Sequence, residues 1–159
     1  MNDRDESHLR RAIEVARRSV EHGNLPFGAV LVDADDRLVL EAENTSLTEH
    51  DPTGHAETNL MREAGRRFEP DYLAGCTMYT SCEPCAMCAG AVYWVGVRRV
   101  VYALDIPGLD AIVGGDPRNP TPHLRADVVL NGGKFPIALE GPGLLEEARA
   151  LHVGAWHDV

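Results

Sequence analysis

Two cysteines, Cys85 and Cys88, stand three residues apart directly after a proline. Proline has no N–H to lose and a φ near the helical value, so this spacing predicts a helix that begins at Pro84. Both thiols then lie in the first turn, where unpaired N–H groups and the positive end of the helix dipole stabilise anions. Because metals bind the thiolate, the pair is predicted to be half of a metal site.

Two thiolates do not complete a tetrahedral zinc site. The natural third ligand is an imidazole from another element, with the fourth position left for water. His55 is the best candidate, because it follows the turn-rich run 51–54 and precedes a helix-favouring run. Glu57 is then held beside the metal without binding it, where a carboxylate can take a proton from zinc-bound water and return it to a leaving group. The sequence therefore predicts Glu57 as the catalytic residue and one Zn²⁺ per chain, with a bound water or hydroxide as nucleophile, held by His55, Cys85 and Cys88.

A Cys-x-x-Cys pair alone is equally typical of a redox pair or of a structural zinc site. Together with Cys82, the pair also imitates part of a ferredoxin-type iron–sulfur run, but the fourth cysteine is missing from its expected place. The preceding proline and the upstream His-x-Glu favour catalytic zinc. We expect Cys76 to pack in the core, since its surroundings are typical of a buried strand, and Cys82 either to line the pocket or to pack.

The order of these segments resembles the cytidine deaminase-like superfamily, because His-x-Glu followed by Pro-Cys-x-x-Cys is the signature of zinc-dependent base deaminases. The resemblance covers about residues 9–105 and includes the runs 26–30, 51–57 and 79–91. Within the superfamily, the sequence is most similar to bacterial guanine deaminases and next to tRNA adenosine deaminases. The resemblance implies an α/β fold, with three α/β/α layers around a central five-stranded mixed sheet. It also implies hydrolytic deamination of a small nucleobase or nucleoside, a guanine-type aminopurine being favoured.

The resemblance further implies a set of substrate contacts. Asn44 matches an asparagine that contacts the substrate, and its amide offers a donor and an acceptor, although an asparagine in a turn is common. The backbone N–H of Ala56 is expected to bind a ring oxygen or nitrogen. Phe27 and Trp94 match aromatic positions of guanine deaminases and are expected to hold a planar base. The alternative is strand-core packing for Phe27, and packing on the sheet or a subunit contact for Trp94.

Three further residues are candidates for the substrate site because the sequence departs from the guanine deaminase pattern. Those enzymes close the site with a longer C-terminal tail, so here we expect Trp156 either to fold over the pocket or to pack on the last helix. The acidic residue that selects an aminopurine has no clear match, and Asp116 and Glu140 are its candidates, each with a loop or turn role as the alternative.

The sequence leaves alternative functions open. They are a cytosine, cytidine or aminotriazine deaminase, a tRNA adenosine-to-inosine deaminase, and a non-catalytic module whose zinc only holds the fold.

Length and charge limit the partners. A chain of 159 residues suits one domain over residues 1–159. Its 15 basic and 25 acidic residues give a net charge of −10, which disfavours a nucleic acid, since tRNA requires a basic patch. No apolar run reaches the roughly 18 residues of a membrane span, and the clustered thiols fit a reducing compartment. We expect a cytoplasmic protein that acts on small molecules and, from the resemblance, forms a homodimer.

Hydrophobic periodicity predicts the elements that position these residues. An amphipathic helix is predicted over 5–22 and a hairpin over 27–42, before the helix that starts at His55. Later strands alternate with helices, which implies parallel pairing with helices on both faces of the sheet. The segment 105–136 is rich in Gly, Pro and Asp, so we expect it to line the pocket or an interface. The remaining predicted strands cover residues 76–80, 97–103 and 137–139, and a closing helix covers 143–152.

Overall fold

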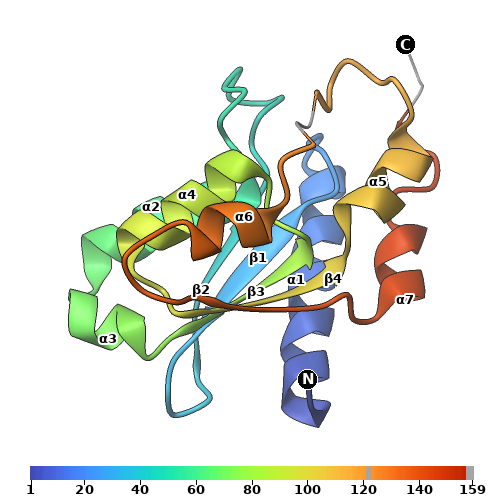
Figure 1. Cartoon of the computed structure of the whole chain (residues 1–159). Helices are drawn as coiled ribbons and strands as arrows, with labels where there is room; N and C mark the ends of the chain where they lie inside the picture. Colours follow the sequence, from blue (N-terminus) through green and yellow to red (C-terminus); the bar gives the residue numbers. More distant parts are fainter. Residues whose placement is uncertain (121–122, 157–159) are drawn as a thin grey trace.

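The computed structural model describes residues 1–120 and 123–156. Five strands form one sheet in the order β2-β1-β3-β4-β5 (Figure 1). β1 pairs antiparallel with β2 and β3, whereas β3, β4 and β5 pair in parallel. The sheet is therefore mixed and five-stranded, as the sequence predicts. The strands are β1 (Gly28–Val32), β2 (Leu38–Glu43), β3 (Thr77–Cys82), β4 (Arg99–Leu104) and β5 (Ala138–Glu140).

Helices cover both faces of this sheet and make three layers (Figure 1). Successive residues of a strand point to opposite faces, so Leu31 and Met78 pack in one buried cluster while Val30 and Tyr79 pack in another. On the first face lie α2 (Ala56–Arg67), α3 (Pro70–Ala74), α4 (Ala86–Val95) and α6 (Ala126–Asn131). On the second face lie α1 (Asp3–Glu21), α5 (Ile106–Val113) and α7 (Leu145–Ala150).

The start of α4 and two short helices differ from the sequence prediction. Pro84 was predicted to be the first helical residue, but α4 begins at Ala86, because Cys85 has an extended backbone with φ −66° and ψ 170°. The stretch 66–75, for which the sequence analysis gives no helix, contains α3, and the glycine- and proline-rich segment 105–136 contains α5 and α6. Helices of five to eight residues complete too few turns to produce a clear period in the sequence.

Four chain segments meet at one end of the sheet. β3 and β4 are parallel, with Cys82 beside Leu104, so the chain leaves both strands at this end. β1 runs antiparallel to β3 and to β2, so β1 begins and β2 finishes at the same end. Phe27, Asn44 and the loop 83–85 therefore come together. α1 packs directly on the start of β1, where a side chain at Gly28 would lie 2.3 Å from the backbone of α1.

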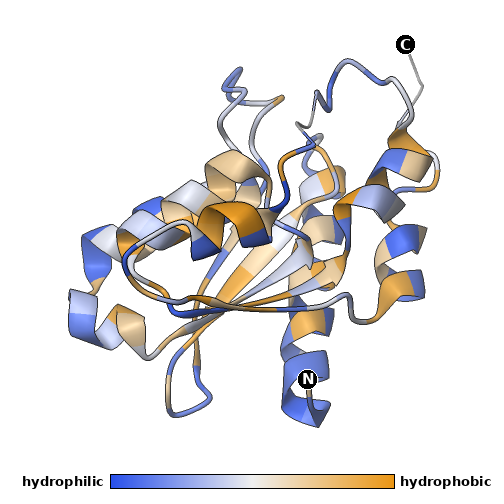
Figure 2. Cartoon of the chain, viewed as in Figure 1, coloured by the Kyte–Doolittle hydropathy of each residue, from blue (hydrophilic) through white to orange (hydrophobic). Residues whose placement is uncertain are grey.

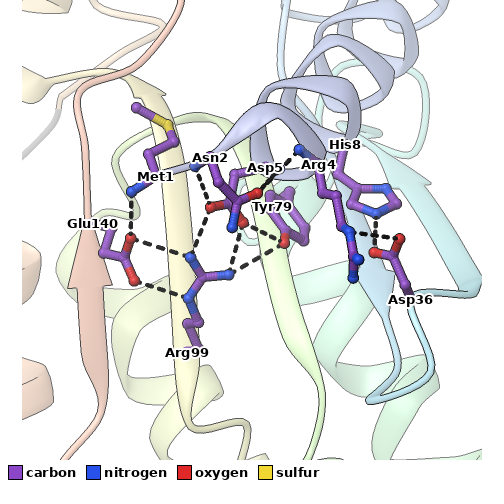
Figure 3. Close-up of polar contacts among 9 residues, drawn as sticks. All are labelled: Met1, Asn2, Arg4, Asp5, His8, Asp36, Tyr79, Arg99 and Glu140. Atoms are coloured by element: carbon purple, nitrogen blue, oxygen red, sulfur yellow. Dashed lines mark hydrogen bonds and ion pairs between the residues drawn. The ribbon is translucent and has the colours of Figure 1, made fainter.

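The opposite end of the sheet is held by a polar cluster (Figure 3). Arg99 of β4 donates two hydrogen bonds to the buried carboxylate of Asp5, at 2.8 and 3.0 Å. Tyr79 of β3 donates a third, at 2.8 Å. Arg99 also donates to Glu140 of β5 at 2.8 Å. The cluster fixes the first turn of α1 on three strands.

No helix among the described residues has both the length and the apolar character needed to cross a membrane.

Candidate active site

Three potential metal ligands converge where α2 and α4 begin. The ligand atoms of His55, Cys85 and Cys88 all lie within 4.8 Å of one another. His55 is the N-cap residue of α2 and Cys85 is the N-cap residue of α4. The Nδ1 atom of His55 lies 3.6 Å from each of the two sulfur atoms. Residues separated by about thirty positions in the sequence are thus brought into one cluster by the packing of two helices.

The geometry of this cluster fits a zinc ion. With Zn–S bonds of about 2.3 Å and Zn–N bonds of about 2.05 Å at tetrahedral angles, a ligating nitrogen and sulfur lie about 3.6 Å apart. The observed distances from Nδ1 to both sulfur atoms match this value. Within the described part of the chain, no fourth His, Cys, Asp or Glu joins the group. The donor set therefore leaves one tetrahedral position to a ligand from solution, as in catalytic zinc sites.

The Cys85 and Cys88 thiols are joined by a hydrogen bond. This bond from Cys88 lowers the pKa of the Cys85 thiol and raises that of Cys88. His55 hydrogen-bonds the Cys85 sulfur as well, which lowers the same pKa further. One thiolate is therefore available to attract a cation before any metal binds.

Glu57 stands beside these ligands in the first turn of α2. Its side chain is 4% exposed, and burial raises the pKa of its carboxyl above the ordinary value. The Thr80 hydroxyl donates a hydrogen bond to Oε1 at 2.7 Å, and the Cys88 sulfur lies 3.6 Å from Oε2. A buried carboxyl group with a raised pKa and a fixed orientation is suited to accept and return protons.

A cavity of about 430 Å³ opens onto Glu57. Its volume lies within the range of sites that bind small organic molecules. Six residues that the sequence analysis singles out line it, namely Phe27, Asn44, His55, Glu57, Cys82 and Cys85. The other lining residues are Leu25, Ser46, Leu47, Pro52, Glu83, Met87, Ile106, Leu109, Pro117, Arg118, Asn119 and Pro120.

Comparison with known proteins identifies the family. Residues 2–104 match the family described as the cytidine and deoxycytidylate deaminase zinc-binding region. The chain belongs to this family. A probable cytosine deaminase of Schizosaccharomyces pombe is 34% identical over 98% of this chain and 94% of its own length. The guanine deaminase of Bacillus subtilis is 43% identical over 63% of this chain and 64% of its own length.

Solved structures of related proteins share the fold. The structure of a guanine deaminase from Nitrosomonas europaea has a TM-score of 0.76 at 26% identity and covers 94% of this chain and 83% of its own. A solved structure in complex with 8-azaguanine has a TM-score of 0.78 at 26% identity, over 95% of this chain and 83% of that chain. The three-layer fold is thus that of the cytidine deaminase-like superfamily, as the sequence predicts.

Asn44 of this deaminase family member offers a ligand a donor rather than both a donor and an acceptor. The side chain is 1% exposed, and its Oδ1 accepts hydrogen bonds from the Ser46 backbone N–H at 3.0 Å and from the Ser46 hydroxyl at 2.8 Å. A backbone N–H can only donate, so this contact fixes the orientation of the amide. No described residue accepts from Nδ2.

Phe27 forms the aromatic wall of the deaminase cavity, and Trp156 supports it from behind. The Phe27 ring lies 5.4 Å from the His152 ring and 6.1 Å from the Trp156 ring, between centroids. Trp156 is buried and donates from Nε1 to His152 Nδ1 at 3.1 Å. Of the two roles expected for Trp156, the structure has the packing role, since this residue does not line the cavity.

Three predicted substrate contacts do not reach the cavity of this chain. Trp94 is 87% exposed on the outer face of α4, so its ring cannot hold a base in this pocket. The Glu140 carboxylate is bound to Arg99 at the opposite end of the sheet. Asp116 is buried under Arg118, which contacts Asp116 Oδ2 at 2.6 Å and itself lines the cavity. Both acidic candidates are thus engaged by arginines.

Ala56 and the later cavity wall complete the comparison with the sequence. Ala56 is the buried first residue of α2, between His55 and Glu57. Its N–H is therefore one of the helix-start groups that have no partner inside the helix.

The expectation that the segment 105–136 lines the pocket is confirmed for parts of residues 106–120. Sequence reasoning missed Arg118 and Glu83 in the lining, and for Glu83 its place inside the cysteine motif was the available signal.

Proposed function

We propose that this chain is a zinc-dependent hydrolase that releases ammonia from a small amino-substituted nucleobase or nucleoside, with a guanine-type aminopurine as the favoured substrate. In this proposal residues 1–159 form one deaminase domain. The observation that carries it is the incomplete donor set of His55, Cys85 and Cys88 next to the buried carboxyl of Glu57, at the floor of a cavity. A zinc that only held the fold would have no use for an open position.

The chain's own residues account for the movement of protons. A zinc ion, when bound, lowers the pKa of a water molecule and so supplies a nucleophile at neutral pH. Glu57 accepts one proton as the water oxygen attacks the ring carbon that carries the amine, and passes it to the adjacent ring nitrogen. The carboxylate then takes the second proton and delivers it to the departing amine, which leaves as ammonia. Thr80 holds the carboxylate in position through its 2.7 Å hydrogen bond.

The cavity favours a planar base with a hydrogen-bond acceptor on its edge. Phe27 presents an aromatic wall, against which a heterocycle stacks. Asn44 Nδ2 is a donor, suited to a ring nitrogen or an exocyclic oxygen. The guanine deaminases among the relatives and the 8-azaguanine complex support an aminopurine.

Cytosine is the second candidate substrate, and one observation favours it. The probable cytosine deaminase matches 98% of this chain, whereas the match to the Bacillus subtilis guanine deaminase covers 63%. The family match ends at residue 104, before the cavity wall that includes Ile106, Leu109 and Arg118. The Nitrosomonas europaea guanine deaminase also extends over this wall, but at 26% identity against 34% for the probable cytosine deaminase, so the higher identity favours the latter as a guide to the substrate contacts. An adenosine in tRNA is disfavoured by the net charge of −10.

The proposed enzyme is a cytoplasmic homodimer. Zinc-binding thiols are best preserved in a reducing compartment, which supports the cytoplasm. α4 contains no charged residue, and Trp94 and Val128 expose apolar side chains on α4 and on its neighbour α6. Two copies of a chain with a net charge of −10 associate most readily through the surface of α4, which has no charged residue of its own.

The test is ammonia release by the zinc-loaded protein from guanine, guanosine, adenine, cytosine, cytidine and an aminotriazine. We expect turnover of guanine, and a loss of about 10²-fold or more in kcat for Glu57→Ala, with the zinc content unchanged. Glu63→Ala is the matched control, because Glu63 lies in the same helix and pairs with Arg67 at the surface. Turnover of cytosine alone would select the second candidate. An inactive zinc-loaded protein would contradict the proposal, and an active, zinc-replete Glu57→Ala variant would refute the role of Glu57.

A further inference from the structure

One buried carboxylate inside the cysteine motif has no part in the chemistry above. Glu83 follows the last residue of β3 and lies two residues before Cys85, and its side chain is 1% exposed. Its Oε2 accepts a hydrogen bond from the Ile106 backbone N–H at 3.1 Å. Its Oε1 accepts from the Arg125 Nε–H at 2.7 Å and from the Ala126 backbone N–H at 3.3 Å. All of these donors are distant from Glu83 in the sequence.

The two backbone donors are the first residues of two helices. Ile106 begins α5 and Ala126 begins α6, where N–H groups have no partner inside the helix and the dipole favours a negative charge. The N-cap residue of α6, Arg125, makes no side-chain capping bond of its own. Glu83 therefore supplies the cap that α6 lacks and adds a partner at the start of α5.

These two anchor points delimit one side of the cavity. The wall segment, defined as residues 106–120 with 123–126, starts and finishes on the Glu83 carboxylate. The backbone of Glu83 is also attached to the strand before this segment, because its N–H donates to the Leu104 carbonyl at 2.7 Å. The cavity-lining residues of the wall segment are Ile106, Leu109, Pro117, Arg118, Asn119 and Pro120.

We propose that Glu83 is a positioning residue that fixes the wall segment at a set distance from the metal ligands. This inference rests on the proposed function, since it assigns the wall a role in holding the substrate over Glu57. Although Glu83 lines the cavity, both of its carboxylate oxygens are bound by the two ends of the wall segment, while its backbone belongs to the loop that carries Cys85. The carboxylate thus joins the two parts of the site that must not move relative to each other during the reaction.

The bonding pattern requires a carboxylate at this position. Both oxygens accept from N–H donors, and each of those donors can only donate. In Glu83→Gln the side-chain NH₂ must face either Ile106 or the Arg125–Ala126 pair, and that side loses its acceptor. The substitution keeps the size of the side chain, so it separates the loss of hydrogen bonding from the loss of packing.

The experiment compares zinc-loaded wild type and Glu83→Gln by amide hydrogen exchange and by steady-state kinetics. We expect faster exchange in α5 or α6, a rise in KM of about tenfold, a smaller change in kcat, and unchanged zinc content. Arg125→Gln removes only the guanidinium contact, so exchange should rise in α6 but not in α5. Glu41→Gln is the control: Glu41 also accepts from side-chain donors, Arg11 and Arg18, but it lies away from the wall.

Exchange and KM equal to wild type in Glu83→Gln would overturn the proposal. Loss of zinc from Glu83→Gln would also overturn the proposal, because Glu83 would then hold the loop that carries Cys85 rather than the wall segment. If Glu83→Gln does not fold, Arg125→Gln decides, and it must alter both the exchange of α6 and KM. The exchange measurement needs no substrate, so an absence of turnover in wild type would contradict the proposed function and leave the anchoring role to be judged by exchange alone.

Discussion

The four cysteines illustrate how environment, rather than residue type, selects a metal ligand. Cys76 packs in the core, donates to the Tyr72 carbonyl, and has its pKa raised to about 11 by burial. Burial also raises the pKa of Cys82, although this thiol lines the cavity. Cys85 is the exception, because Cys88 and His55 hydrogen-bond its sulfur and lower its pKa. Only the last pair of thiols stands at a helix start opposite an imidazole.

The first prediction therefore compares two cysteines of the same loop. Cys85→Ser should reduce the zinc content from one per chain to well below half, because a serine hydroxyl does not ionise at neutral pH and is a poor zinc ligand. Cys82→Ser should keep one zinc per chain, since Cys82 is outside the ligand group. Metal content is measured by atomic emission after dialysis against a weak chelator. A Cys82→Ser variant that loses zinc would contradict the ligand set.

At the scale of elements, the strands were predictable from the sequence because each has a local pattern. Strands starting at Gly28 and Leu38 surround a turn that begins at Asp33, and the observed hairpin follows this pattern. The three potential zinc ligands were recognisable for a different reason: each lies at or next to a helix start that has a local sequence pattern, and the packing of α2 against α4 then brings them together. The start of α4 was wrong by two residues, since a proline before an N-cap gives the same sequence pattern as a proline at the first helical position.

The orientation of α4 was not predictable. A helix that is apolar on all sides has no polar face, so its sequence does not reveal which side chains face the sheet. Trp94 was accordingly expected in the pocket and is exposed instead. Asp116 and Glu140 each pair with an arginine. The partner of Asp116 is Arg118, two residues away, whereas the partner of Glu140 is Arg99, 41 residues away, which only the tertiary structure brings near.

The chain after α7 allows a prediction about pH. His152 is 1% exposed, and its Nδ1 accepts from Trp156, so the imidazole is neutral in the folded state. Burial lowers its pKa from 6.5 to about 4. Between these two values the unfolded state binds more protons, so the contribution of His152 to stability is complete above pH 6.5 and is lost as the pH falls to 4. The loss amounts to about 3 kcal/mol.

His152→Gln removes this titration. Relative to wild type, the free energy of unfolding of the variant should fall less steeply between pH 6.5 and 4, as measured by urea denaturation at several pH values. The exposed His50 provides the control, since His50→Asn should keep the wild-type slope. The comparison between variants cancels the release of zinc at acid pH, which affects all of them. An unchanged slope in His152→Gln would contradict the buried neutral imidazole.

At the scale of the whole molecule, the two ends of the sheet have different tasks. The end that carries Asp5, Arg99 and Glu140 joins α1 to the strands through charged hydrogen bonds (Figure 3). The other end carries the potential metal ligands and the cavity on loops and helix starts. Ligand sites in open α/β sheets lie at the carboxyl ends of parallel strands, and here β3 and β4 supply those ends.

The last prediction concerns the exposed outer surface of α4. Figure 2 shows no strongly hydrophilic residue along α4, whereas the first turns of α1 are hydrophilic. On this surface Trp94 is 87% exposed, and a large aromatic residue in an uncharged patch is typical of the centre of a protein interface. Since the chain carries a net charge of −10, a second copy meets the least repulsion at this patch. We therefore expect Trp94 to lie at the centre of a homodimer interface.

Light scattering after size-exclusion chromatography measures the mass directly. Wild type should have twice the chain mass of 17.4 kDa, and Trp94→Lys should have the mass of one chain, because burying an unpaired ammonium and losing the indole weaken association by roughly 30-fold or more. Val153→Lys is the matched control: Val153 is 79% exposed near the end of the chain, and its substitution should leave the dimer intact. A monomeric wild type would contradict the homodimer, whereas a dimeric Trp94→Lys would move the interface to another face.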